Sequence, residues 1–235
     1  MVHLDVKPHE KFPGIFWVNT ETGARKLATK NLTPGRSVYG ERLIRSDHAE
    51  YRLWDPYRSK LAAGILKQVR NNPIKPGQRI LYLGSATGTT VSHVSDIIGE
   101  NGKAYCVEFS SRAMREFVDN LCSYRENLYP ILADARFPDK YPTLVALVDV
   151  VYSDVAQVEQ AKILADNADK HLKAEGWVMI AVKSRSVDVT KSPSDVFKGE
   201  MQVLEGRGFE LVETIRLEPY ERDHAMIIAH KRPKQ

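Results

Sequence analysis

The chain is poor in cysteine, and this excludes several kinds of site. Its 235 residues include two cysteines, Cys106 and Cys122. Two cysteines without C-x-x-C spacing supply neither a disulfide framework nor the ligand set of a structural zinc site. We therefore expect both to be reduced core residues, one in a strand and one in a helix, and we expect no metal centre.

Long apolar runs, internal repeats and low-complexity tracts are also absent from the sequence. A membrane-spanning helix needs about 20 consecutive apolar residues, and no run approaches that length. The first seven residues, MVHLDVK, lack the apolar centre of a signal peptide. We therefore expect no membrane association and a cytoplasmic protein.

Charge of one sign is only slightly in excess. Lys and Arg number 34 against 30 Asp and Glu, which gives a formal net charge of +4. This excess permits an anionic partner such as nucleic acid but does not require one. No RNP aromatic pair, KH loop or zinc knuckle of a sequence-specific RNA reader occurs. The basic residues are scattered along the chain: Arg42, Arg45, Arg52, Arg58, Lys60, Lys183 and Arg185. We expect most of them to lie on a solvated face, and those near the predicted crevice to be placed to track a phosphate backbone.

The first 55 residues predict a small antiparallel β module. Strand-forming runs at 14–19 and 24–28 flank a turn sequence that contains Gly23. A second pair of strands is predicted around 37–42 and 49–54. We assign this module to residues 1–55 and a larger α/β domain to residues 56–235.

The larger domain predicts a Rossmann-like, seven-stranded and mostly parallel sheet. It opens with a helix expected from Pro56 through Lys67, and beyond Gly77 short apolar strands alternate with helices. The last two strands are too close for a crossover helix, so we expect an antiparallel edge hairpin. Six parallel strands and one reversed strand are typical of class I methyltransferases, which at this point is fold analogy. The predicted strands are 79–83, 103–108, 128–133, 148–153, 176–183, 209–217 and 225–230, with helices between the first six.

The sharpest local feature is a strand-turn-helix segment, ILYLGSATGTTV, at residues 80–91. Gly84 permits a tight turn and close approach of a ligand, and Thr89 or Thr90 is placed to cap the helix that follows. Glu108 ends the next predicted strand, 24 positions after Gly84, where an acid accepts both hydroxyls of a nucleoside ribose. The pattern predicts a nucleoside-containing ligand, but an ordinary strand-turn-helix with a fortuitous later acid explains the glycines equally well.

The same loop favours S-adenosylmethionine over a dinucleotide. A dehydrogenase loop has the pattern G-x-G-x-x-G, whereas this chain has Ala86 at the second glycine position and Thr89 at the third. A looser loop suits a ligand without phosphates. Asp134 follows the strand at 128–133, where its carboxylate can accept a hydrogen bond from an adenine amino group. The alternative for Asp134 is a surface turn.

Four polar side chains stand where the predicted topology opens a crevice. Asp154 and Lys183 follow or end two neighbouring strands, so both point to the carboxyl edge of the sheet. Lys60 lies on the helix before the sheet, and His224 opens the last strand. The sequence therefore places two lysines, an aspartate and a histidine within reach of one crevice.

The chain closely resembles the fibrillarin family, the ribose 2′-O-methyltransferases of box C/D guide ribonucleoproteins, in its short archaeal form. The glycine- and arginine-rich arm of the eukaryotic members is absent, which indicates an archaeal source. The matching segments occur in family order and cover most of the chain: 51–60 (YRLWDPYRSK), 81–92, 107–111, 149–157, 181–185 and 219–226.

The resemblance implies a set of cofactor-binding residues for S-adenosylmethionine. Glu108 would hold the ribose, Phe109 would stack near the adenine, and Asp134 with Ala135 would read the edge of the base. Asp154 and Gln157 would lie beside the methionine and the reactive methyl group. The remaining implied residues shape the methionine side of the pocket: Gly84, Ala86, Thr89 and Thr90.

The resemblance also implies a catalytic set of Lys60, Asp154, Lys183 and His224. A ribose hydroxyl is a poor nucleophile until its proton is being removed, and it must lie in line with the sulfonium methyl. We expect Lys183 to be the base, because a neighbouring cation and partial burial would favour its neutral form. Asp154 would orient that lysine and the cofactor, and Lys60 and His224 would position the ribose or its phosphate.

Partners follow from the same resemblance. We expect a Nop-family scaffold protein, a kink-turn-binding protein on the guide RNA, and a box C/D guide RNA that selects sites in rRNA or tRNA, with weak RNA binding by the chain alone.

Two alternative functions stay open. A small-molecule or protein methyltransferase is disfavoured by Lys60 and Lys183, because such substrates rarely need two cations beside a sulfonium. A non-enzymatic ribonucleoprotein subunit is disfavoured by the intact acidic and lysine positions.

Overall fold

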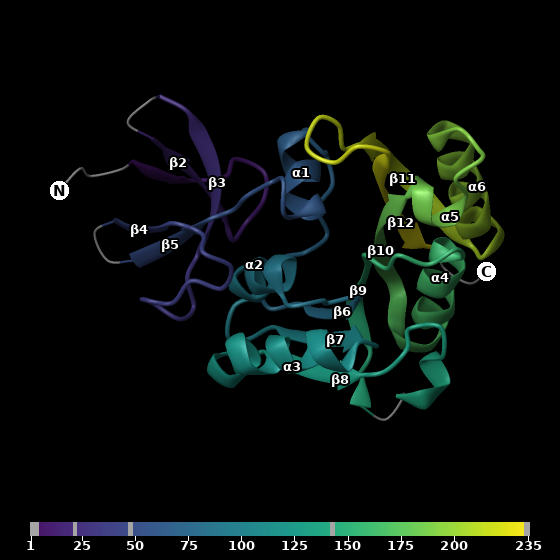
Figure 1. Cartoon of the computed structure of the whole chain (residues 1–235), viewed down its shortest axis with the longest axis horizontal. Coiled ribbons are helices and arrows are strands. Elements are labelled where there is room, and N and C mark those ends of the chain that lie inside the picture. Colours follow the sequence, from purple (N-terminus) through teal and green to yellow (C-terminus); the bar gives the residue numbers. More distant parts are fainter. Residues whose placement is uncertain (1–4, 21–22, 47–48, 142–143, 233–235) are drawn as a thin grey trace.

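The computed structural model describes residues 5–20, 23–46, 49–141 and 144–232, which form two β-sheets with helices around the larger one. In Figure 1 the smaller, N-terminal sheet lies at one end of the molecule, and the larger sheet carries helices on both faces. Within the part of the chain that is described, no helix is long and apolar enough to span a membrane.

The N-terminal sheet is five-stranded and antiparallel, with the order β1-β2-β3-β5-β4. This confirms an N-terminal β module, but the strand expected at 37–42 is wrong. There the carboxylate of Glu41 accepts hydrogen bonds from the backbone of Val38 and Tyr39, which holds an irregular loop. β1 was not expected, because three residues carry no alternating pattern. The strands are β1 (Val6–Pro8), β2 (Ile15–Asn19), β3 (Arg25–Lys30), β4 (Leu43–Ser46) and β5 (Ala49–Leu53).

The larger sheet has seven strands in the order β11-β12-β10-β9-β6-β7-β8. β12 runs antiparallel to both of its neighbours, and the remaining pairs are parallel. The Rossmann-like architecture with an antiparallel hairpin at one edge is therefore confirmed. The strands are β6 (Arg79–Leu83), β7 (Lys103–Glu108), β8 (Leu128–Leu132), β9 (Val148–Ser153), β10 (Leu172–Lys183), β11 (Phe209–Arg216) and β12 (His224–Lys231).

Alternate residues of each central strand feed two apolar layers. In β6, Ile80 and Tyr82 pack with α1, α2 and α3, while Leu81 and Leu83 pack with α4 and α6 on the opposite face. This alternation is why the central strands are apolar throughout. The helices are α1 (Lys60–Leu66), α2 (Thr89–Ile98), α3 (Ser111–Asn120), α4 (Gln160–His171), α5 (Ser184–Val187) and α6 (Pro193–Gly206), with 3-10 turns η1 (Cys122–Tyr124) and η2 (Pro138–Lys140).

In the larger domain, three differences from the expected elements exceed a single residue. α1 begins at Lys60 rather than at Pro56, because the hydroxyl of Ser59 accepts a hydrogen bond from Ala62 N and caps the helix there. In the described residues between β8 and β9 the structure has η2 and no α-helix, in keeping with Pro138 at its start. β10 begins at Leu172 rather than at 176, with a register shift before Trp177.

Both cysteines are free: Cys106 is buried in β7, and Cys122 lies in η1 rather than in an α-helix.

A buried polar network joins the N-terminal sheet to α2. The Asp96 carboxylate accepts hydrogen bonds from Arg52 at 2.9 Å and from Arg125 at 2.5 Å, and all three side chains are nearly inaccessible to solvent. Arg52 also donates to Glu41 at 2.6 Å. The apolar core continues across the same junction, because residues of the N-terminal module such as Phe12 belong to the cluster beneath α1 and α2. The module therefore packs against the larger domain and is not suspended on a linker.

Candidate active site

The loop between β6 and α2 is shaped by glycines that no other residue can replace without strain. Gly84 has φ +82°, and a Cβ there would lie 2.6 Å from the carbonyl oxygen of Asp154. Gly88 has φ +95°, and a Cβ there would lie 2.7 Å from the ring of Phe117. Between them Ala86 also has a positive φ, +48°, a conformation that is uncommon for residues with a side chain. The backbone at this strand end is thus held in a tight curve.

The helix cap expected from Thr89 or Thr90 is wrong. α2 is preceded by Gly88 as its N-cap, and no side chain caps it. Thr90 instead donates a hydrogen bond from its hydroxyl to Ser59 Oγ at 3.0 Å. A left-handed glycine at the N-cap lets the chain enter α2 directly from the curved loop, so the first backbone N–H groups of the helix stay uncapped by side chains.

A cavity of about 260 Å³ opens at the carboxyl ends of β6, β7, β8 and β9. Eight of the ten residues expected to bind a cofactor line it; Thr89 and Thr90 are not among its lining residues. The edge of the parallel sheet is where ligands bind in this class of fold. The lining residues are Gly84, Ala86, Val107, Glu108, Phe109, Ala133, Asp134, Ala135, Arg136, Asp154, Val155, Ala156, Gln157 and Ile163.

Glu108 is anchored at the end of β7. One carboxylate oxygen accepts a hydrogen bond from Ala86 N at 3.0 Å, and the other accepts one from Ser110 N at 2.8 Å. These bonds fix the side chain, which is 7% exposed, and each oxygen retains a further lone pair. Glu108 therefore both holds the curved loop and presents acceptors to the cavity wall. Phe109, the next residue, is 67% exposed, which is unusual for a large apolar ring.

Asp134 combines the two arrangements that the sequence left open. It lines the cavity, and its carboxylate also accepts hydrogen bonds from Arg136, from the backbone N at 2.9 Å and from the guanidinium at 2.7 Å. The side-chain hydrogen bond from Arg136 lowers the pKa of the Asp134 carboxyl. Asp134 is thus an ionised acceptor in a local turn at the rim of the cavity.

Lys60 and Asp154 form an ion pair at the edge of the cavity. The Lys60 ammonium lies 3.0 Å from a carboxylate oxygen of Asp154, and the two side chains are about four-fifths buried, at 20% and 22% exposure. Lys60 comes from the first turn of α1 and Asp154 from the loop after β9. We expected Asp154 to orient Lys183, and this is corrected: the lysine that it holds is Lys60.

Lys183 and His224 face each other as cross-strand partners of β10 and β12. Lys183 is exposed rather than partly buried, so the expected burial is wrong. Its backbone is held by Gln160, which accepts from Lys183 N at 3.0 Å and donates to Lys183 O at 3.1 Å. His224 is 7% exposed, and its Nδ1 donates to the carbonyl oxygen of Arg222 at 2.7 Å.

Sequence reasoning missed several residues that shape the site. Ser59 caps the helix that carries Lys60, Gln160 fixes the backbone of Lys183, and Arg136 binds Asp134. The Asp134–Arg136 contact had a local signal, because an aspartate accepting from the residue two positions later forms a common turn. Gln160 had no such signal, because its partner is 23 positions away.

The comparisons with known proteins agree with this geometry. The family model described as Fibrillarin matches residues 6–233. The chain belongs to the fibrillarin family. A "Fibrillarin-like rRNA/tRNA 2′-O-methyltransferase" of Pyrobaculum aerophilum is 57% identical over 230 residues, which are 97% of this chain and 98% of that protein.

Two solved fibrillarins extend the comparison to three dimensions. The Aeropyrum pernix fibrillarin, solved with natively bound S-adenosyl-L-methionine, is 50% identical with a TM-score of 0.91, covering 97% of this chain and all of that one. The fibrillarin of a fibrillarin/Nop5p complex is 43% identical with a TM-score of 0.80, covering 88% of this chain and 94% of that one. The fold of this chain is therefore that of the fibrillarin family along nearly its whole length.

The cavity fits S-adenosylmethionine on its own chemistry. Glu108 presents acceptors suited to a ribose diol, and Asp134 presents acceptors suited to an amino group. Phe109, which follows Glu108 and also lines the cavity, presents an exposed ring. Asp154 adds a negative charge at the rim, which suits a cationic sulfonium. The loop at Gly84 approaches Asp154 so closely that it leaves no room for even a Cβ. Among the described residues no cluster of His, Cys, Asp or Glu is placed to hold a metal.

Proposed function

We propose that this chain transfers the methyl group of S-adenosylmethionine to ribose 2′-hydroxyls of rRNA, and of tRNA, at sites chosen by a box C/D guide RNA. The observation that carries the proposal is the Lys60–Asp154 pair, since Asp154 both lines the cofactor cavity and holds a cation at its edge. The name of the Pyrobaculum aerophilum relative and the cofactor in the Aeropyrum pernix fibrillarin support the same activity.

The residues of the cavity divide the binding of the cofactor among them. Glu108 accepts hydrogen bonds from the ribose hydroxyls, Phe109 stacks on the adenine, and Asp134 with Ala135 meets the edge of the base. Asp154 and Gln157 lie beside the methionine portion. Gly84 and Ala86 line that side, and Thr89 and Thr90, which do not line the cavity, shape it through the start of α2. When bound, S-adenosylmethionine supplies an electrophilic methyl group.

Lys183 is the base in this proposal, and Lys60 has a different task. Lys60 donates to Asp154, and from this ion pair it can also contact the ribose or its phosphate. Lys183 forms no ion pair within the described residues and is exposed at the end of β10. In this proposal the amine of Lys183 accepts the 2′-hydroxyl proton as the methyl group is transferred. His224, opposite Lys183, positions the ribose.

Assembly with partners completes the proposal. The Nop5p complex of a 43% identical fibrillarin supports a Nop-family scaffold protein as the partner of this chain. The guide RNA pairs with its target, and a kink-turn-binding protein on the guide joins the scaffold. The archaeal sources of the relatives support the cytoplasm of an archaeal cell as the site of action.

The test is methyl transfer in a reconstituted particle. The chain is mixed with the scaffold protein, the kink-turn protein, guide RNA and labelled methyl donor, with a target RNA or the same target carrying one 2′-deoxy nucleotide. We expect label only on the ribose target and only with guide. Label on the deoxy target would place the chemistry on a base or a protein, and cofactor binding without label would favour a non-enzymatic subunit. Lys183→Ala should abolish transfer; unchanged transfer would overturn its role as base.

A further inference from the structure

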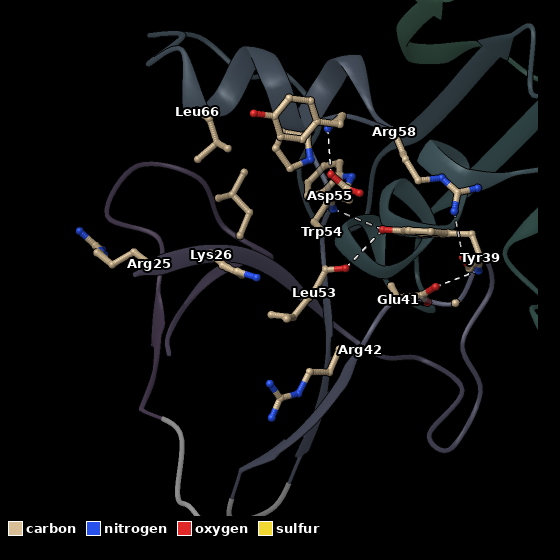
Figure 2. A pocket seen from close by; sticks show the side chains of 14 residues that line it. Arg25, Lys26, Tyr39, Glu41, Arg42, Leu53, Trp54, Asp55, Arg58 and Leu66 are labelled. Carbon is tan, nitrogen blue, oxygen red and sulfur yellow. Dashed lines mark hydrogen bonds between the residues drawn. The ribbon is translucent and has the colours of Figure 1, made fainter. Parts of the chain in front are cut away.

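A second cavity, larger than the cofactor cavity, lies between the N-terminal sheet and α1. Its volume is about 520 Å³, and it is lined by residues 25–27, 39–42 and 53–58 together with Leu66. We call it the module groove. Figure 2 shows Lys26 and Arg42 reaching into it from the N-terminal module and Leu66 and Arg58 from the opposite side. None of these residues belongs to the cofactor cavity.

The exposed charge around the module groove is positive. Lys26, Arg42 and Arg58 are exposed, and neither Lys26 nor Arg42 has an ion-pair partner in the described ranges. The acidic residues are occupied. Glu41 is 2% exposed and binds Arg52, and Asp55 accepts a hydrogen bond from Tyr57 N at 2.9 Å. A ligand entering the groove therefore meets the two unpaired cations Lys26 and Arg42, whereas Glu41 is paired with Arg52 and one carboxylate, Asp55, has no ion-pair partner in the described residues.

The floor of the module groove is apolar and ends in an exposed aromatic ring. It is lined by Leu27, Leu53, Leu66 and the buried Trp54. Tyr57 at its edge is 63% exposed, and its ring meets the edge of Tyr220 at a centroid distance of 5.3 Å. An exposed ring next to an apolar floor and free cations suits stacked bases joined by phosphates.

The edge of the module groove is close in sequence to two residues of the proposed catalytic set. Tyr57 and Arg58 belong to its lining, Ser59 caps α1, and Lys60 reaches Asp154. Tyr220, which contacts Tyr57, lies four residues before His224. The Tyr57–Tyr220 contact at the edge of the groove therefore joins the segments that carry Lys60 and His224.

We propose that the module groove binds a stretch of single-stranded RNA, with Lys26 and Arg42 on phosphates and Tyr57 stacked on a base. The connection of this RNA to catalysis rests on the proposed function, but the binding itself does not. Duplex RNA keeps its bases stacked inside and would leave the apolar floor and Tyr57 unused. An acidic peptide would satisfy the cations but has no comparable need for an exposed ring.

The first test measures direct binding of the isolated full-length chain to a fluorescent twelve-nucleotide oligouridylate. The double variant Lys26→Gln/Arg42→Gln is compared with Lys75→Gln/Lys198→Gln, which removes the same charge from exposed lysines elsewhere. Each lost phosphate contact lowers the slope of log affinity against log salt by about 0.7, so two lower it by about 1.4. We expect this fall in the slope for the groove variant and a smaller fall for the control variant. Equal slopes in the two variants would overturn the proposal.

Tyr57 gives an independent test of stacking. Tyr57→Ala should weaken oligouridylate binding roughly tenfold, and Tyr57→Phe, which keeps the ring, should bind like the parent chain. A duplex of the same length should bind less tightly than the single strand. Equal affinity for the duplex, or loss of binding in Tyr57→Phe as well as in Tyr57→Ala, would contradict a stacking site.

The reconstituted particle identifies which RNA occupies the groove. A photoreactive 4-thiouridine is placed either in the unpaired flank of the target or in an unpaired part of the guide, and the crosslinked peptide is mapped. A crosslink to residues 53–58 from either strand supports the proposal and names the source. Oligouridylate binding unaffected in the groove variant, together with loss of scaffold association, would make the groove a protein-docking surface and overturn it. A particle that crosslinks but transfers no methyl group would refute the proposed function alone.

Discussion

Thr90 donates a hydrogen bond to Ser59 Oγ at 3.0 Å, and this contact ties the helix after the cofactor loop to the helix that carries Lys60. Ser59 is 1% exposed and Thr90 is 8% exposed. The same Ser59 oxygen accepts from Ala62 N and caps α1. Two buried hydroxyls therefore set the position of the Lys60 ammonium relative to the loop at Gly84.

Removing the Ser59 hydroxyl should affect stability modestly and turnover more strongly. Ser59→Ala loses a helix cap, which costs about 1 kcal/mol, and frees the start of α1 from α2. We expect lower kcat with nearly unchanged affinity for the methyl donor, measured by urea unfolding and by methyl transfer in the particle. Ser192→Ala, which removes the corresponding cap of α6, should lose similar stability and keep its kcat. Equal kcat in both variants would show that the Thr90–Ser59 contact has no part in placing Lys60.

The charge of Asp154 should matter more than its shape. Asp154→Asn leaves Lys60 without its anion and removes a negative charge from the cofactor cavity. We expect a fall in kcat of about 100-fold or more, the usual scale for a positioned acid–base group, together with weaker donor binding by calorimetry. Asp149→Asn is the matched control, because Asp149 pairs with Lys173 at 2.6 Å near the other end of β9. The interpretation fails if the two variants lose activity equally.

A methyl group at Gly84 should disrupt the cofactor cavity, whereas one at Gly77 should not. Both glycines have a positive φ, +82° and +79°, so an alanine at either costs about 1–2 kcal/mol of backbone strain. A Cβ at Gly84 would in addition lie 2.6 Å from Asp154 O, while a Cβ at Gly77 meets nothing within 4 Å. We expect Gly84→Ala to lose more stability and to bind the donor more weakly. Identical donor affinity in Gly84→Ala and the parent chain would contradict this reading of the loop.

The buried His93 should make stability depend on pH. Burial, with the nearby Arg52 and Arg125, lowers the pKa of His93 well below its ordinary 6.5, so the folded chain holds the neutral ring. The unfolded chain takes up a proton below about 6.5, which means that stability is present above that pH and is lost as the pH falls below it. The contribution is up to about 1.4 kcal/mol per pH unit.

Urea unfolding between pH 5 and 7.5 measures this dependence. His93→Gln should be less stable at pH 7.5 but should lose stability less steeply on acidification than the parent chain. Burial also lowers the pKa of His9 and His171, and these residues contribute to both proteins alike. Parallel pH profiles would show that His93 is not the group responsible.

Local pattern predicted most of the large sheet. β6, β7 and β9 have the bounds expected from their apolar runs, because each is bounded by polar or glycine-rich sequence that ends a buried strand. The prediction was wrong where the conformation of a segment depends on a distant residue or on a single side chain. The segment at 37–42 is held open by Glu41, and the start of α1 is decided by Ser59.

Short-range patterns in the sequence identify the residues that form the site, whereas their pairing depends on the tertiary structure. Strand ends, the loop at Gly84 and the acids at 108 and 134 follow from short-range patterns, since strand alternation and turn chemistry act over a few residues. The ion pair of Lys60 and Asp154 joins positions 94 residues apart, and the exposure of Lys183 depends on the packing of β10 and β12. The module groove likewise exists only where the N-terminal sheet meets α1. Contacts of this range depend on where folded elements are packed against one another, and no local pattern encodes that geometry.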